Sequence, residues 1–103
     1  EAQIPYRMNE DFCTKPTSGV VTLTDFHHVV PFNRESLKSA LANVGPIAVS
    51  VDAEHWTFYH DGLYDGPCSP VELDHAVLAV AYNTVGTDYW VIKNSWSKYW
   101  GMN

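Results

Sequence analysis

Residues 75–94 read HAVLAVAYNTVGTDYWVIKN, and this stretch decides the fold. Two apolar runs, residues 75–82 and 89–94, flank the six turn-prone residues 83–88. Short apolar runs around a polar, glycine-containing linker are typical of a β-hairpin. We therefore expect two antiparallel strands, with the start of the first beside the end of the second.

Upstream of the hairpin, residues 33–46 carry the clearest helical signal. Apolar side chains recur there at helical spacing, namely Leu37, Ala40, Leu41 and Val44. Asn33 is a suitable N-cap, and Gly45 followed by Pro46 ends the helix. We expect one amphipathic helix that lies outside the sheet.

Three further segments have the character of strands. Residues 47–52 alternate between apolar and small or polar side chains, which predicts a strand with one face in the core. Residues 20–24 and 26–32 favour extended backbone and predict two short strands. One helix with several antiparallel strands gives an α+β fold, with a strongly curved sheet or open barrel.

The composition restricts the class of protein. The 103 residues allow one globular domain at most, and 46% hydrophobic with 17% charged residues exclude a disordered chain. Twelve acidic and six basic residues give a net charge of −6, without a basic stripe for nucleic acid. For this reason we expect no nucleic acid as partner. We also expect no membrane, because no apolar run approaches the roughly 20 residues of a membrane span.

His75 is the histidine best placed for chemistry. It opens one hairpin strand while Asn94 closes the other, so strand pairing brings their side chains together. An asparagine oxygen that accepts from one imidazole nitrogen leaves the other nitrogen free to act as a base. Trp96 would cover that bond from water. The same pattern also fits a structural histidine beside a turn asparagine.

Metal binding and a local thiol nucleophile are the competing interpretations. His27 and His28 point to opposite faces of an extended chain, and no cluster with zinc spacing surrounds His55 and His60. Cys68 lies in a turn-rich segment without a helix start or nearby base to activate its thiol. We expect no metal and no cofactor.

The two cysteines leave several pairings open. Cys13 and Cys68 are compatible with one mutual disulfide, with bonds to other chain segments, or with free thiols. The residues alone do not choose among these.

A series of motifs in fixed order resembles a known family. The blocks are VGPIAV at 44–49, FY and GLY within 58–64, Cys68, LDHAV at 73–77, YWVIKNSW at 89–96, and WG at 100–101. Together they resemble papain-like cysteine proteases of the cathepsin L type. The resemblance implies that residues 1–103 are the sheet-rich C-terminal half, or right domain, of that fold. The fold is then incomplete without an N-terminal half and its final strands.

The resemblance implies a Cys-His-Asn triad. His75 matches the general base and Asn94 the residue that orients it, whereas the cysteine nucleophile and a glutamine oxyanion donor belong to the N-terminal half. The implied function is that of one part of a cysteine-type endopeptidase, which is inactive alone. Its implied partners are the N-terminal half and a peptide or protein substrate.

The resemblance also implies residues that contact substrate or shield the site. Trp96 matches the tryptophan over the His–Asn bond, and the backbone carbonyl of Asp74 matches an acceptor for a substrate amide. Ser50, Leu73 and Ala76 fall where the main specificity pocket is lined. Two small residues beside a leucine favour a hydrophobic substrate side chain.

Cys13 and Cys68 resemble family cysteines whose partners lie outside this chain. The resemblance therefore implies two disulfides to other segments, and with them a lysosomal or secreted setting. Three residues depart from the family pattern, because Ala81, Asn83 and Ser97 stand where glycine is usual. The geometry of the hairpin loop and of the cover over the site depends on whether their backbone needs a positive φ.

Two other interpretations remain. A papain-fold homologue that lacks the nucleophile and serves as a binding or structural component would retain His75 and Asn94 equally well. An autonomous β domain that binds a protein is disfavoured, because it would leave a sheet edge and both cysteines without partners.

Overall fold

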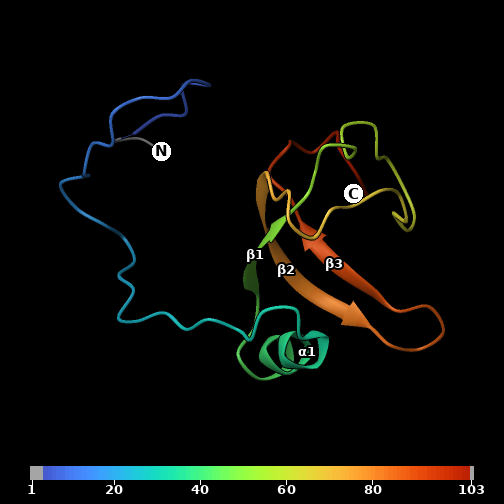
Figure 1. The fold of residues 1–103 in the computed structure, drawn as a ribbon. Coiled ribbons are helices and arrows are strands. Elements are labelled where there is room, and N and C mark those ends of the chain that lie inside the picture. The colour runs from blue at the N-terminus through green and yellow to red at the C-terminus, as the bar shows by residue number, and fades with distance from the viewer. Residues whose placement is uncertain (1–3, 103) are drawn as a thin grey trace.

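One helix and one antiparallel sheet form the body of the molecule in the computed structural model, which describes residues 4–102 (Figure 1). The elements follow the order α1 (Arg34–Asn43), β1 (Ile47–Val51), β2 (His75–Asn83) and β3 (Tyr89–Lys93). The sheet has the order β1-β2-β3, and both neighbouring pairs are antiparallel. This open sheet with one flanking helix is the expected α+β arrangement.

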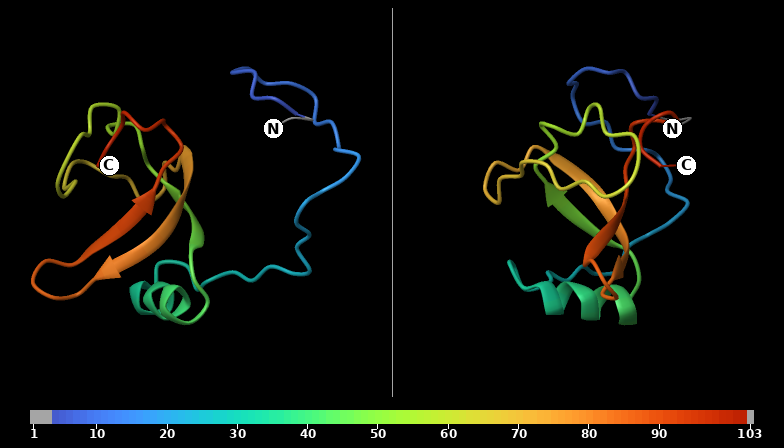
Figure 2. Two further views of the ribbon diagram at one scale, coloured as in Figure 1. Left: turned by 180° about the vertical axis from the view of Figure 1, so that it is seen from behind. Right: turned by 90° about the vertical axis from the view of Figure 1, so that its right-hand side faces the viewer.

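The helix α1 has the ends that its sequence predicts. Asn33 Oδ1 accepts a hydrogen bond from the backbone N–H of Ser36 at 2.9 Å, which caps the first turn. Beyond the last turn, Gly45 has a φ of 120°, a conformation that favours glycine. Leu41 is buried, and the helix lies at the end of the sheet near the β2–β3 hairpin (Figures 1 and 2).

Residues 20–24 and 26–32 do not form strands, so that part of the prediction is wrong. They make no ladder with the sheet, and all but one of them are exposed. They belong to a segment that runs away from the sheet in Figure 1 and in the left view of Figure 2. A preference for extended backbone does not produce a strand where no neighbouring strand supplies hydrogen bonds.

A bulge in the β2–β3 hairpin decides which side chains share a face. Near the turn Ala81 pairs with Val91, whereas farther along Ala79 pairs with Ile92. Val80 is therefore one extra residue in β2. Because side chains alternate along a strand, one extra residue exchanges the faces of all the β2 residues that precede it.

The bulge brings the predicted site residues to the same face. Val77 and Ala79 are buried on the core face of β2, and His75 follows them by alternation. The same alternation along β3 and beyond places Asn94 and Trp96 on that face. If Val80 instead paired with Ile92 in a regular ladder, His75 would lie on the face opposite to Asn94.

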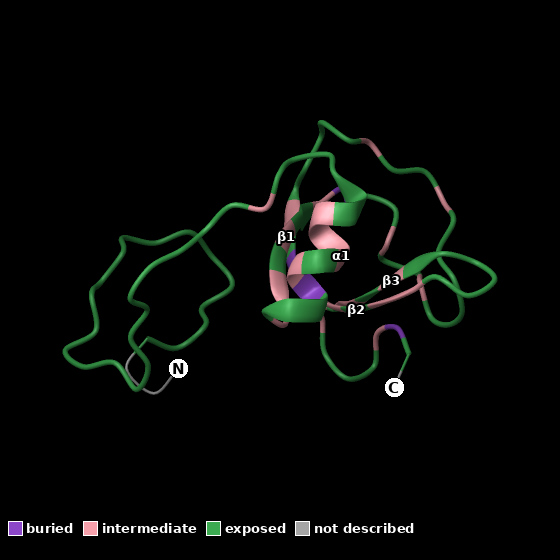
Figure 3. Cartoon of the chain, turned by 90° about the horizontal axis from the view of Figure 1, so that it is seen from below, coloured by how far each residue is buried: buried purple, intermediate pink, exposed green. Residues whose placement is uncertain are grey.

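The core of the described residues is small. The buried apolar residues there are only Leu41, Ala53, Val77 and Ala79, and Figure 3 shows how little of the ribbon is coloured as buried. Large apolar side chains remain exposed along the N-terminal segment, among them Phe12, Val21, Leu23, Phe26 and Phe32. Exposed apolar surface on this scale is typical of a face that contacts another part of a protein.

We expect deletion of Val80 to convert the bulge into a regular ladder with the same pairs on either side. β1 pairs only with residues 75–79 of β2, so its contacts are retained. The lost packing of one valine is expected to lower the free energy of unfolding of the full-length protein by about 1–2 kcal/mol. A crystal structure of the deletion variant with His75 and Asn94 on opposite faces would contradict this account.

Candidate active site

His75 and Asn94 meet at the end of the sheet away from the hairpin turn. His75 Nε2 lies 2.8 Å from Asn94 Oδ1, so the predicted hydrogen bond is confirmed. The backbone N–H of Ser95 donates to the same Oδ1 at 2.8 Å, which identifies that atom as the carbonyl oxygen. Because a carbonyl oxygen only accepts, Nε2 is the donor in this bond, and in the neutral imidazole Nδ1 is then the nitrogen with the lone pair.

Trp96 lies against His75, the residue whose bond to Asn94 the sequence analysis expects it to cover. Its ring stacks on the imidazole of His75 with a centroid distance of 4.8 Å and an angle of 29°. Trp100 contacts Trp96 edge to face, with a centroid distance of 5.1 Å, and so helps to hold the Trp96 ring in place. One side of the imidazole is thereby shielded from water.

Trp56 completes the support, and the sequence analysis missed it. The indole N–H of Trp100 donates to the backbone carbonyl of Trp56 at 2.9 Å. The two indoles also stack at 6.3 Å, and Tyr59 contacts Trp100 at 5.3 Å. Trp56 and Trp100 are 44 residues apart in a loop and a tail without periodicity, so no local pattern indicated the contact.

Asp74 is fastened on two sides directly before His75. Its backbone N–H donates to the carbonyl of Val51 at 3.1 Å, and its carboxylate accepts from the N–H of Ala53 at 2.8 Å. The main chain that enters β2 is thus held to the segment that leaves β1. This places the backbone of Asp74 beside the His–Asn pair.

The three predicted pocket residues lie in two places. Ser50 and Ala76 pair across β1 and β2, and both are exposed. They occupy the face opposite to His75, because adjacent residues of a strand alternate. Leu73 lies in the preceding loop and is 51% exposed. An open hollow on β2 and the end of β3 includes one of these residues, Ala76. Its other lining residues are Val77, Leu78, Lys93, Asn94 and Ser95.

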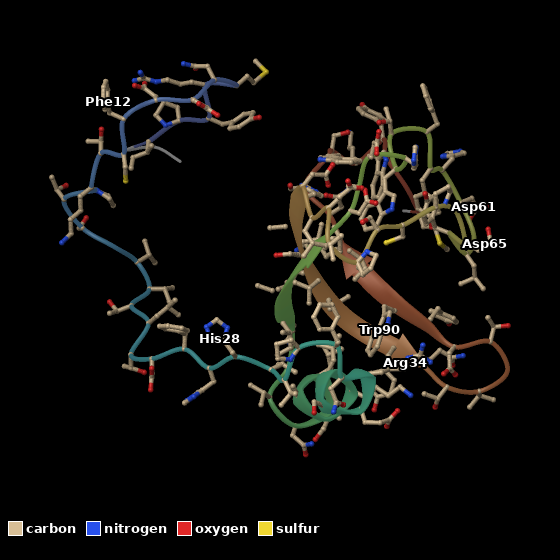
Figure 4. All side chains as sticks on the ribbon, in the orientation of Figure 1. Phe12, His28, Arg34, Asp61, Asp65 and Trp90 are labelled. Atoms are coloured by element: carbon tan, nitrogen blue, oxygen red, sulfur yellow. The ribbon has the colours of Figure 1, made fainter. Side chains whose placement is uncertain are left out.

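His27, His28 and Cys13 belong to the exposed N-terminal segment and not to the site. His27 and His28 are exposed, and Figure 4 shows His28 on the segment that precedes α1, outside the sheet. Within residues 4–102, no three metal-ligating side chains gather into a group. Cys13 and Cys68 are exposed, unbonded thiols in this chain. No helix of the described residues has the length and apolar character to span a membrane.

The departures from the family pattern have different consequences. Ala81 and Asn83 do not have a positive φ, and the Asn83 amide donates to Val85 and Thr87 carbonyls across the hairpin loop at 2.8 and 2.9 Å. Ser97 has a φ of 84°, which is costly for any residue except glycine. Its hydroxyl accepts from the N–H of Tyr99 at 3.2 Å.

We expect Ser97→Gly to raise the free energy of unfolding of the full-length protein by about 1 kcal/mol. Relief of the left-handed backbone, worth roughly 1–2 kcal/mol, exceeds the loss of one exposed hydrogen bond of about 0.5 kcal/mol. Chemical denaturation measures the change. Ser39→Gly in α1 is the control and should destabilise, because glycine is unfavourable within a helix. Equal destabilisation by both variants would contradict the assignment of strain.

Asp52 is a buried carboxylate close to the site, with 7% of its surface exposed. The backbone N–H groups of Ser69 at 2.6 Å and Glu54 at 3.1 Å donate to it. These two bonds hold the pKa of Asp52 below its ordinary value of 3.8, and nearby His55 contributes in the same direction. Burial raises the pKa of the Tyr64 phenol, with smaller contributions from Cys68 and Asp52.

The lowered pKa of Asp52 predicts the pH dependence of its contribution to stability. The unfolded chain takes up the proton near pH 3.8, whereas the folded chain takes it up only at lower pH. The contribution is therefore complete above pH 3.8 and is lost as the pH falls through the folded-state pKa. The difference in unfolding free energy between the parent and Asp52→Ala, measured from pH 7 to 2.5, should shrink only below about pH 4. A difference that does not change with pH would contradict this.

This chain is similar to known cysteine proteases. The family described as papain family cysteine protease matches residues 1–103. Digestive cysteine proteinase 3 of Homarus americanus is 40% identical over 105 residues, which cover 98% of this chain and 33% of that protein. Cathepsin L2 of Homo sapiens is 40% identical over 112 residues, which cover 100% of this chain and 34% of that protein.

A solved structure has a similar fold. Digestive procathepsin L 3 of the Tenebrio molitor larval midgut matches with a TM-score of 0.65 and 41% identity, over 71% of this chain and 25% of that chain. The present chain spans about a third of the length of the curated relatives it matches.

Proposed function

Because the chain belongs to the papain family of cysteine proteases, we propose that it supplies the base and its orienting residue to a papain-like endopeptidase. In this proposal residues 1–103 are the C-terminal half of the catalytic domain. An N-terminal half carries the cysteine nucleophile, in keeping with relatives that are about three times longer than this chain. The procathepsin structure likewise extends well beyond the matched region.

The observation that carries the proposal is the hydrogen bond from His75 Nε2 to Asn94 Oδ1, 2.8 Å long. It fixes the tautomer and the plane of the ring, so the lone pair on Nδ1 has a defined direction. The ring of Trp96 stacks on the imidazole of His75, and in this proposal it shields the bond to Asn94 from water. A positioned imidazole of this kind is what a thiol nucleophile needs for activation.

The reaction follows from these roles. Nδ1 of His75 accepts the proton of the cysteine thiol, and the thiolate attacks a peptide carbonyl carbon. The imidazolium then donates that proton to the leaving amine as the C–N bond breaks. In the second stage Nδ1 takes a proton from water, whose oxygen attacks the thioester carbonyl carbon. As the C–S bond breaks, the acid is released and the imidazolium returns the proton to the thiolate.

Exposed apolar surface and exposed cysteines support a partner half. The exposed fractions of Phe12, Leu23 and Phe26 are 96%, 84% and 74%. Cys13 and Cys68 present free thiols at the surface, available for disulfides to other segments. We propose these two disulfides, and with them a lysosomal or secreted setting, in keeping with the relative named a digestive proteinase.

For the substrate, we propose a peptide that binds along the loop before β2. The backbone carbonyl of Asp74 accepts a substrate amide, and exposed Leu73 contacts a hydrophobic side chain. The pocket proposed for that side chain also includes Ser50 and Ala76, two small residues that pair across β1 and β2. The proposed chemistry uses no cofactor, because His75 transfers both the proton of the cysteine thiol and the proton of water.

We expect His75→Ala in the full-length protein to lower kcat for a peptide substrate by at least about 10³-fold, because the general base is lost. Asn94→Ala should lower kcat by about 10-fold to 100-fold, because the ring keeps its nitrogen but loses its fixed plane. His28→Ala changes an exposed histidine outside the sheet (Figure 4); it is the matched control and should leave kcat unchanged.

Labelling with a thiol-directed epoxide separates the proposal from its alternative. The active protein should be labelled on one cysteine of the N-terminal half, and His75→Ala should slow that labelling. A parent protein that neither cleaves peptides nor reacts with the epoxide would identify a non-catalytic papain-fold homologue.

A further inference from the structure

Asp52 is a buried carboxylate with no role in the proposed chemistry. It follows the last residue of β1, and 7% of its surface is exposed. The sequence has no lysine or arginine between Lys38 and Lys93, and no such residue forms an ion pair with Asp52 within residues 4–102. A buried charge without a cation requires several hydrogen-bond donors.

Both oxygens of Asp52 accept backbone N–H groups. Oδ1 accepts locally from Glu54 at 3.1 Å, and Oδ2 accepts from Ser69 at 2.6 Å across 17 residues of sequence. The second bond is a long-range connection between the end of β1 and the loop that leads to β2. These two donors also explain why the pKa of Asp52 is lowered and the carboxylate stays ionised.

Ser69 transmits this connection to the rest of the loop. Its hydroxyl accepts from the N–H groups of Val71 at 3.3 Å and Glu72 at 3.1 Å, which makes residues 69–72 a turn. Fixing Ser69 therefore fixes the turn that directly precedes Leu73. At its other end the loop is held by the bonds of Asp74 to Val51 and Ala53.

We propose that Asp52 is a positioning residue for substrate binding. It anchors the loop 69–74 at Ser69, while the bonds of Asp74 anchor it at β2, and the backbone of Leu73 and Asp74 is held between these two points. This inference rests on the proposed function, in which Leu73 and Asp74 contact the substrate. His75 itself is paired with Val51 inside the sheet, so it does not depend on Asp52.

Two substitutions of Asp52 test these bonds. Asp52→Asn disturbs the pair of acceptors, whereas Asp52→Ser removes only the long-range bond to Ser69. Asp52→Asn replaces one acceptor oxygen by an NH₂ group, which then faces a backbone N–H instead of accepting from it. Asp52→Ser keeps an oxygen that can accept from Glu54 two residues on, but its side chain is too short for Ser69. Glu72→Gln, an exposed position in the same loop, removes the same charge as Asp52→Asn and is the matched control.

The experiment measures hydrogen exchange and kinetics on the full-length protein. We expect the amide of Ser69 to exchange at least about tenfold faster in both Asp52 variants and at the parent rate in Glu72→Gln. With a peptide substrate, both Asp52 variants should raise KM about tenfold and change kcat by less than about threefold. A residue that only stabilised the fold would lower the active fraction, and hence kcat, without raising KM.

Each result decides the proposal. Unchanged exchange at Ser69 in both variants would overturn the anchoring role, whatever the enzyme activity. Faster exchange with unaltered KM would overturn the link to substrate binding. If the parent protein cleaved no peptide, the proposed function and the link to substrate would fail together, while exchange at Ser69 would still decide the anchoring role. Should Asp52→Asn not fold, Asp52→Ser carries the same comparison.

Discussion

The register of the β2–β3 hairpin is the constraint on which the rest of the site depends. The extra residue Val80 moves the pairing by one position between Ala81 and Ala79. Since side chains alternate, that single shift places His75 on the face that carries Asn94 and Trp96. The 2.8 Å bond between His75 and Asn94 and the stacked indole over it exist only in this register.

Loops build the remainder of the site, and a few long-range polar bonds hold them. Trp100 donates to the carbonyl of Trp56, and Asp52 accepts from Ser69, so loop and tail are joined to the end of the sheet. The core beneath them is small, with four buried apolar side chains among the described residues. A site on so small a core depends on such bonds for its precision, because apolar packing alone supplies little.

The sequence predicted the elements whose signal is local. Alternation and capping in residues 33–94 correctly predicted the helix, β1 and the hairpin, and the hairpin led directly to the His75–Asn94 bond. Residues 20–32 were assigned to strands wrongly, because propensity does not report whether a partner strand is present. The bulge at Val80 and the contact of Trp56 with Trp100 are tertiary features, and no periodicity in the chain encodes either. For Ser97, the sequence showed only that a serine stands where glycine is usual, and the structure then showed that its φ is positive.

The central claim is that this chain presents one free imidazole nitrogen to a cysteine carried by another part of the protein. A crystal structure of the full-length protein tests it most directly. The account predicts a cysteine sulfur at the start of a helix, within hydrogen-bonding distance of His75 Nδ1, while Nε2 remains bonded to Asn94. A serine or glycine at that place, or an Nδ1 that faces a different group, would contradict it.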